Sequence, residues 1–339
     1  MIENTEAMEM RAREDVGLAQ DLIPPVSPLA AALHGRFLAF HCTACFRPLE
    51  SPLLCAACRG ATRYCSAACF TADSSAHSAS GECRLLFLRH NRDDGDTDLR
   101  VALRFLHLFE STGPVHLASL PERPRRVAGL LASDLEKVIE EEGEMAERIA
   151  EGAALMSLAR DRDRSRVGGG EAVTPEEVLW AVLTNAVEVQ VSEVGPLGVA
   201  VYGPGFSWFN HSCLPNACYR FELAQSSSEQ GCAKPKSLLA SPAAVGVAAD
   251  TLKAWICAGS GLAHGFSKFG PRVIVRSIKP IKKDEKICIT YIDLLQPKIK
   301  RQSDLWEKYR FVCRCWRCSL SSQIYMDLVL NGIELWQLR

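Results

Sequence analysis

The sequence lacks any run of about 18 apolar residues, so we expect no membrane-spanning helix. It also lacks an excess of charge, because 39 lysines and arginines balance 40 aspartates and glutamates and leave a net charge of −1. The net charge therefore produces no electrostatic attraction of the whole chain to nucleic acid or to an anionic membrane surface. The opening residues, MIENTEAMEMRARED, contain no apolar core and do not form a secretory signal. We expect a protein of the nucleus or the cytoplasm.

What the sequence does contain is a large supply of apolar residues and of cysteine. Of its 339 residues, 47% are hydrophobic, which is enough for two domains or for one large elaborated domain. Fifteen residues are cysteine, and structural disulfides are rare in reducing compartments. Seven of these cysteines lie between Cys42 and Cys83, and three more lie between Cys313 and Cys318. Such clustering indicates metal ligands.

The first cluster has the spacing of a zinc-binding segment. Its ligands are the pairs Cys42-x2-Cys45, Cys55-x2-Cys58 and Cys65-x3-Cys69, followed by His77 and Cys83. Eight ligands suffice for two closed tetrahedral zinc sites. The segment is too short for a core of its own, so bound metal is expected to supply its folding free energy. The histidine is an open choice, because His41 directly precedes Cys42 and because His77 could be a surface residue.

Periodicity and turn chemistry predict helices before residue 190, strands after it, and charged helices again at KIKRQSDLWEKYRF and after residue 320. Apolar residues at helical spacing from Leu99 to Phe109 predict one helix, and a second begins at Ser133 and decays near residue 160 into charged, glycine-rich sequence. Thr174-Pro175-Glu176-Glu177 is a helix start that leads into VLWAVLTNAVEVQ. Strands are predicted at LGVAVYG, NACYRFEL, RVIVRSIKPI and EKICITYIDLL. A long insertion, rich in Ser, Ala and Gly, is predicted from about 224 to 270.

Residues 205–221, GFSWFNHSCLPNACYRF, crowd an amide, an imidazole, a hydroxyl and a thiol against apolar neighbours. Polar side chains so close together either bond to one another in a turn or face a ligand. The NHSCxPN pattern at 210–216 resembles the signature of SET-domain lysine methyltransferases. Two further segments support the resemblance: ITYID at 289–293 is similar to the strand that carries the family's catalytic tyrosine, and CxCxxC at 313–318 is similar to its post-SET cysteine triad.

The cysteine block between Cys42 and Cys83 resembles the MYND zinc finger. The chain as a whole therefore resembles the SET-and-MYND methyltransferases over residues 10–320, and the plant members most of all. In the MYND finger the first and third ligand pairs share one ion, and the second and fourth share the other. The resemblance thus implies one zinc ion on Cys42, Cys45, Cys65 and Cys69, and a second on Cys55, Cys58, His77 and Cys83. In the SET family the NHSC cysteine completes the post-SET site, which implies a third zinc ion on Cys213, Cys313, Cys315 and Cys318.

The fold that this resemblance implies is α+β. It consists of a SET-domain β-fold of short strands, in which the segment near residue 210 threads beneath another loop as a pseudoknot, together with an inserted MYND finger, a helical SET insertion and a post-SET zinc segment. The implied organisation is an N-terminal SET segment at 1–41, the finger at 42–83, the helical SET insertion at 84–190, the core SET at 191–297, the post-SET zinc segment at 298–320 and the start of a truncated helical C-terminal region at 321–339.

The activity that the resemblance implies is S-adenosylmethionine-dependent N-methylation of a lysine in a histone tail or another protein. The methyl group would move by in-line displacement through a tyrosine-lined channel, with Tyr291 as the catalytic hydroxyl. The target lysine must arrive uncharged, which an apolar channel and the cofactor's positive charge both favour. The residues implied to contact the cofactor are Gly17, Asn185, Ser207, Asn210, His211, Tyr291, Tyr309 and Phe311.

The glycine loop that opens SET domains departs from the family pattern. Gly17, in REDVGLA, is retained where the family has Gly-x-Gly, so cofactor affinity is an open question. A second hypothesis is therefore a non-catalytic adaptor whose finger binds proline-containing peptides of transcriptional regulators. The combination of Asn210, His211 and Tyr291 favours the enzyme, because an adaptor has no need of all three.

Direct DNA binding through the finger is not expected. The finger carries few basic residues, chiefly Arg47, Arg59 and Arg63, and has no readable recognition helix. We therefore expect a monomer whose partners are a lysine-bearing protein substrate and, through the finger, proline-rich peptides.

Overall fold

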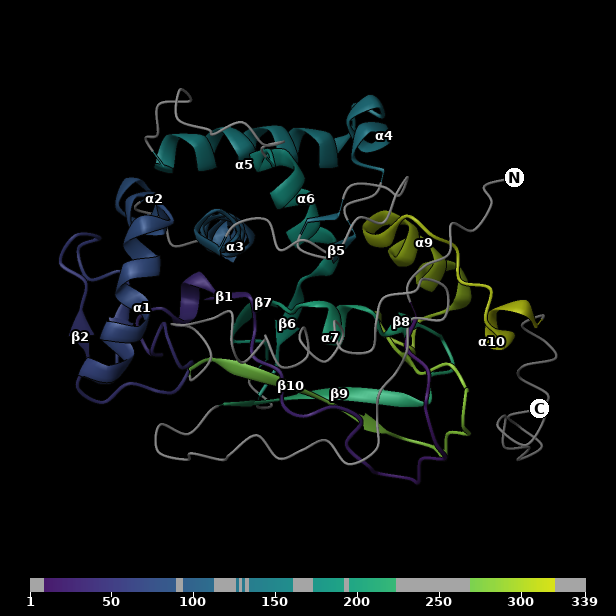
Figure 1. The fold of residues 1–339 in the computed structure, drawn as a ribbon. Coiled ribbons are helices and arrows are strands. Elements are labelled where there is room, and N and C mark those ends of the chain that lie inside the picture. The colour runs from purple at the N-terminus through teal and green to yellow at the C-terminus, as the bar shows by residue number, and fades with distance from the viewer. Residues whose placement is uncertain are drawn as a thin grey trace.

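The computed structural model describes residues 9–89, 94–112, 126–127, 130–131, 134–160, 173–191, 195–223 and 269–320 (Figure 1). The predicted insertion at about 224–270 lies outside these residues except for Phe269 and Gly270, and the predicted C-terminal region at 321–339 lies wholly outside them. Among the described residues, no helix combines the length and the apolar character needed to cross a membrane.

The described residues form an α+β structure in which short strands and helices are mixed along the chain. The α-helices are α1 (Ala67–Ala79), α2 (Glu82–Leu88), α3 (Thr97–Thr112), α4 (Leu135–Glu140), α5 (Glu144–Arg160), α6 (Pro175–Asn185), α7 (Pro204–Ser207), α9 (Lys298–Tyr309) and α10 (Trp316–Ser319), with 3-10 turns η1 (Gly35–Phe37) and η2 (Asp94–Asp96). The strands are β1 (Ala30–Leu33), β2 (Leu53–Leu54), β3 (Arg63–Tyr64), β4 (Arg126–Val127), β5 (Leu130–Leu131), β6 (Val187–Val189), β7 (Gly198–Val201), β8 (Asn210–His211), β9 (Ala217–Leu223), β10 (Pro271–Ser277) and β11 (Cys288–Ile289).

A small antiparallel sheet in the order β1-β7-β6 separates two hydrophobic cores. All four residues of β7 are buried, which explains why its sequence is apolar throughout rather than alternating. Val199 and Val201 pack into the core beneath the helices, whereas Ala200 packs into the other core, as the two-residue period of a strand requires. Strands β1 and β7 approach closely at Gly198, where a Cβ atom would lie 2.2 Å from the carbonyl oxygen of Ala32.

The helical layer consists of α3, α5 and α6, which pack on one side of this sheet (Figure 1). Helix α3 confirms the prediction from the Leu99–Phe109 period. Helix α6 begins with the predicted cap: the Thr174 hydroxyl accepts the Glu177 N–H, and the Glu177 carboxylate accepts the Thr174 N–H. The prediction of a single helix after Ser133, which itself lies outside the described residues, was wrong. The chain forms α4 and α5, because Glu142 turns to a φ of 45° and Gly143 follows it.

The second core lies between the N-terminal segment and the strands β9 and β10. Residues 11–26 run antiparallel to β10 and the chain that follows it, with bridges that include Val16 to Ile281 and Val26 to Val273. Strands β9 and β10 pair along their whole length, from Ala217 with Ser277 to Leu223 with Pro271. These strands confirm two of the sequence predictions and complete the framework that supports the site.

Candidate functional site

The site is organised by a short parallel pairing of β8 with β11, which joins residues far apart in the sequence. Asn210 lies opposite Cys288, and His211 lies opposite Ile289. The chain leaves β11 after Ile289, so Tyr291 lies just beyond the strand and not within it. The NHSC segment and the predicted catalytic tyrosine therefore lie side by side.

Tyr291 is held at both ends by this segment. Its N–H donates to Nδ1 of His211 at 3.1 Å, and its hydroxyl donates to the carbonyl oxygen of Phe209 at 2.6 Å. The ring of Tyr309 lies 4.8 Å from that of Tyr291, and the ring of Phe311 lies 6.1 Å from that of His211, measured between centroids. The structure thus gathers the predicted aromatic residues around one tyrosine.

The aromatic cluster is poorly solvated, and the pKa values of its members reflect this. Burial raises the pKa of Tyr291 and of Tyr309 well above the usual value, and it raises that of Tyr219 to about 12. All three hydroxyls stay protonated in neutral solution. Such a cluster can position a reactant by hydrogen bonding, and it offers a low-polarity wall to a charged side chain.

His211 is neutral and linked to the neighbouring thiol. Burial lowers its pKa to about 4. Because Nδ1 accepts the Tyr291 N–H, the ring proton lies on Nε2, which is 3.2 Å from Sγ of Cys213. The predicted contact of this imidazole with the cofactor stays a prediction, and the structure adds a link from Tyr291 to Cys213 that sequence reasoning did not find.

The cysteine of the NHSC segment and the three late cysteines come together as predicted. The sulfur atoms of Cys213, Cys313, Cys315 and Cys318 all lie within 4.8 Å of one another. Arg317 fixes the group to the site by donating to the carbonyl oxygens of Cys213 at 3.2 Å and Leu294 at 2.9 Å. Arg317 was not predicted, since an arginine inside CxCxxC carries no signal of its own.

The ligands of the finger also form the two predicted groups, namely Cys42, Cys45, Cys65 and Cys69, and Cys55, Cys58, His77 and Cys83. Thiolates on one tetrahedral zinc ion, each about 2.3 Å from it, lie about 3.8 Å apart. The sulfurs of Cys45 and Cys65 are 3.6 Å apart, and those of Cys55 and Cys83 are 3.8 Å apart. Among the described residues the donor sets therefore fit zinc. His77 belongs to one of these groups and His41 does not.

A buried charge network supports the second of these groups. Nδ1 of His77 lies 2.8 Å from the carboxylate of Glu82, which also accepts the Arg104 Nε–H at 2.7 Å. Arg104, on α3, donates as well to Asp73 of α1 at 2.6 Å, and Asp73 accepts the hydroxyl of Tyr64 at 2.9 Å. Burial raises the pKa of Glu82, but the charges of Arg104 and His77 lower it by more. The net effect is a lowered pKa, so the carboxyl is ionised. The network ties the finger to the helical layer.

The remaining predicted cofactor residues occupy varied environments. The hydroxyl of Ser207 is buried and has no hydrogen-bond partner in the part of the chain that the structure describes. Gly17 donates its N–H to Gln20 and accepts the hydroxyl of Ser277 at 2.7 Å, at the end of β10. Asn185 ends α6, where its amide donates to the carbonyl of Ala181 at 2.8 Å. Whether Asn185, Gly17 and Asn210 contact a cofactor stays a prediction.

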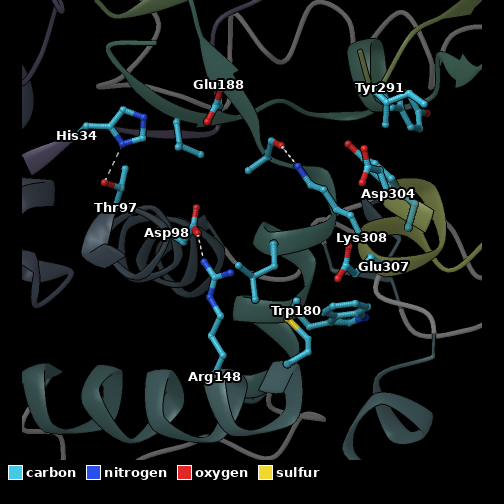
Figure 2. A pocket seen from close by; sticks show the side chains of 16 residues that line it. His34, Thr97, Asp98, Arg148, Trp180, Glu188, Tyr291, Asp304, Glu307 and Lys308 are labelled. Atoms are coloured by element: carbon cyan, nitrogen blue, oxygen red, sulfur yellow. Dashed lines mark hydrogen bonds and ion pairs between the residues drawn. The ribbon is translucent and has the colours of Figure 1, made fainter. Parts of the chain in front are cut away.

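A cavity of about 440 Å³ opens beside the aromatic cluster (Figure 2). Its walls combine Tyr291 and Tyr309 with apolar side chains and with carboxylates from several elements. Lys308 reaches into it from α9, and its amine donates to the carbonyl oxygen of Ala186 at 3.1 Å. The lining residues are His34, Thr97, Asp98, Met145, Arg148, Trp180, Leu183, Ala186, Glu188, Val199, Tyr291, Ile292, Asp304, Glu307, Lys308 and Tyr309.

Comparison with known proteins finds no matching family model, but it finds relatives over most of the chain. Protein SET DOMAIN GROUP 41 of Arabidopsis thaliana is 36% identical over 330 residues, which cover 96% of this chain and 52% of that protein. The histone-lysine N-methyltransferase SMYD3 of Mus musculus is 23% identical over 87% of this chain and 55% of its own length. The N-lysine methyltransferase SMYD2 of Gallus gallus is 23% identical over 84% of this chain and 51% of its own length. The chain spans about half the length of these relatives.

Proposed function

Because this chain belongs to the SET-and-MYND family, we propose that it is a protein-lysine N-methyltransferase that takes its methyl group from S-adenosylmethionine. The observation that carries the proposal is the position of Tyr291. Its hydroxyl is bound by Phe209 and its N–H by His211, and its side chain lines the cavity. An adaptor is not favoured, since the relatives named SMYD2 and SMYD3 are methyltransferases.

The residues around the NHSC segment fit the proposed cofactor. Ser207 offers a buried hydroxyl that lacks a partner among the described residues, and a buried polar group of this kind is stabilised when a ligand supplies the missing hydrogen bond. His211 is neutral, so it places no positive charge against a sulfonium. When bound, S-adenosylmethionine supplies an electrophilic methyl group. Asn210 and Ser207 would hold its polar parts.

The acceptor lysine would enter from the cavity. Tyr291 and Tyr309 line the cavity, but Gly17, Ser207 and His211 do not. The substrate and the cofactor would therefore meet at the tyrosines from different sides. Poor solvation beside Tyr291 lowers the pKa of the incoming lysine, which helps it to lose its proton before it attacks. Tyr291 would orient the amine, and its backbone contacts fix that orientation before the reactants arrive.

Zinc has a structural part in this proposal. A third ion on Cys213, Cys313, Cys315 and Cys318 would tie α9 and α10 to the NHSC segment, and so would hold Tyr309 and Phe311 against Tyr291. The pseudoknot of the family would then enclose the cofactor. Two further ions in the finger would supply folding free energy to a segment with a small core.

Methyl transfer from radiolabelled S-adenosylmethionine to a protein array tests the proposal. We expect label on lysine side chains, and we expect Tyr291→Phe to reduce the rate by about 10²-fold because it removes the hydroxyl that would orient the amine. Tyr202→Phe is the matched control, since it removes a buried tyrosine hydroxyl that donates to the carbonyl of Pro271 at 2.7 Å. No label on any protein, with no binding of S-adenosylmethionine in calorimetry, would instead support an adaptor.

A further inference from the structure

A lysine side chain already occupies the cavity beside the tyrosines. Lys308 leaves α9 next to Tyr309 and reaches across to the junction of α6 and β6 (Figure 2). Its amine donates to the carbonyl oxygen of Ala186 at 3.1 Å, and its Nζ lies 5.3 Å from the centroid of the Tyr309 ring. Ala186 is the last residue bonded to α6, since its N–H donates to Val182, and its own carbonyl points away from the helix ladder.

These contacts are those of an ammonium-binding site. A backbone carbonyl accepts one N–H of an alkylammonium, and the face of an aromatic ring attracts the charge within about 6 Å. Asp98 and Glu188 also line the cavity and add negative charge (Figure 2). Burial lowers the pKa of Lys308, whereas Asp98 and Glu188 raise it, and the net effect is a lowered pKa. The amine of Lys308 is thus held by polar contacts in a place that solvates it poorly.

The charges of the cavity favour a second cation over an anion. Arg148 forms an ion pair with Asp98 at 2.5 Å, and Asp304 forms one with Lys300 at 2.7 Å. Glu188 and Glu307 line the same cavity and are exposed. An incoming lysine side chain therefore meets a wall that attracts its charge and a carbonyl already placed to accept its N–H, with the amine of Lys308 in its way.

We propose that the Ala186 carbonyl, the Tyr309 ring and Glu188 form an entry site for the ammonium group of a substrate lysine, and that Lys308 fills this site in cis until the substrate displaces it. The inference rests on the proposed methyltransferase function for the identity of the substrate, but the ammonium site itself is a property of the free protein. Displacement requires the Lys308 side chain to turn into solvent. Its backbone can stay in place, because it belongs to α9.

Chemical complementation tests the site without any methyl transfer. Lys308→Ala removes the occupant, so n-butylammonium, which matches the lysine side chain, is expected to bind the variant and raise its Tm by about 2–4 °C when nine-tenths of the sites are filled. The wild-type protein and Lys308→Arg should not respond, because their own cations occupy the site. Lys308→Met should not respond either, because its side chain still fills the space. Sodium chloride at equal ionic strength controls for salt.

An equal response of the wild-type protein and Lys308→Ala, or no response of the folded variant, would overturn the proposal. The second measurement uses the wild-type protein, so it does not depend on the folding of a variant. Acetic anhydride should label Lys308 more slowly than the exposed Lys283. A lysine-containing histone tail peptide should raise the labelling of Lys308 severalfold, and the same peptide with norleucine for lysine should not. Unchanged or reduced labelling with the lysine peptide would count against displacement.

The two proposals fail separately. If n-butylammonium binds Lys308→Ala but no protein is methylated, the ammonium site stands and the enzyme does not. If proteins are methylated but butylammonium distinguishes none of the variants, the enzyme stands and Lys308 is an ordinary wall residue.

Discussion

At the residue scale, a substitution of Ser207 is expected to weaken cofactor binding without lowering the stability of the fold. Its hydroxyl is buried without a hydrogen bond among the described residues, so Ser207→Ala should leave the free energy of unfolding unchanged or slightly higher. The same variant should bind S-adenosylmethionine about fivefold more weakly, because one hydrogen bond contributes about 1 kcal/mol. Calorimetric titration and urea unfolding measure the two effects.

The matched control for Ser207 is Ser277→Ala. The Ser277 hydroxyl donates to the carbonyl of Gly17 at 2.7 Å and accepts the N–H of Gln20 at 2.9 Å, so its loss should destabilise the fold by about 1 kcal/mol. A Ser207→Ala variant that unfolds as readily as Ser277→Ala, with cofactor affinity unchanged, would assign Ser207 to the fold and not to the site.

Sequence patterns identify the residues of this site only where a motif marks them. Tyr291, His211 and the twelve candidate metal ligands lie in spaced motifs, and the structure brings these candidates together in the sets that the family resemblance implied. Lys308 and Ala186 belong to no motif. Their roles depend on how α9 packs against the end of α6, and that packing depends on residues far away in the sequence.

At the element scale, the sheet that divides the two cores depends on Gly198. A methyl group there would lie 2.2 Å from the Ala32 carbonyl oxygen, and the nearest atoms all belong to the backbone of Ala32 and Leu33, which cannot move aside as a flexible side chain could. Gly198→Ala should therefore destabilise the fold by about 1–3 kcal/mol in urea unfolding, the usual cost of overpacking. Gly203→Ala is the control, because its added Cβ would meet only the Leu29 side chain at 3.7 Å. Equal stability of the two variants would contradict the close approach of β1 and β7.

Local signals predicted most elements near the site, and they failed where tertiary pairing decides the outcome. The cap at Thr174 and the apolar run of β7 were enough to place α6 and β7. The sequence VLTNAVEVQ was assigned to a helix throughout, but the chain leaves the helix after Asn185 and forms β6. The strand exists because Val187 and Val189 pair with β7, which no local window contains.

At the scale of the whole molecule, Arg104 joins the finger to the helical layer. It is buried, and it bonds Asp73 of α1 and Glu82 of α2 from its place on α3. Arg104→Met should lower the free energy of unfolding by about 3–5 kcal/mol, because the buried carboxylates of Asp73 and Glu82 lose the cation that they share. Urea unfolding of Arg276→Met, whose partner Asp21 is exposed, should stay close to the wild-type protein. A loss no larger than that of Arg276→Met would show that the finger does not depend on this network.

Arg104 also marks what the sequence could not indicate about the assembly of the parts. The motifs imply the α+β class and the order of the segments through the family that they resemble, but they do not say how the finger attaches to the rest. Arg104, Asp73 and Glu82 look like ordinary surface charges of amphipathic helices. They become a buried network only when α1, α2 and α3 meet, so the contact is a property of the folded molecule.

The binding of S-adenosylmethionine to Cys213→Ser tests the central claim most directly. If Cys213, Cys313, Cys315 and Cys318 share one zinc ion that holds the late segment against Tyr291, the variant should lose one ion and bind the cofactor at least about tenfold more weakly. Cys65→Ser should also lose one ion, from the finger, with cofactor affinity unchanged. A Cys213→Ser protein that lacks one zinc ion and still binds S-adenosylmethionine as tightly as the wild-type protein would contradict the claim.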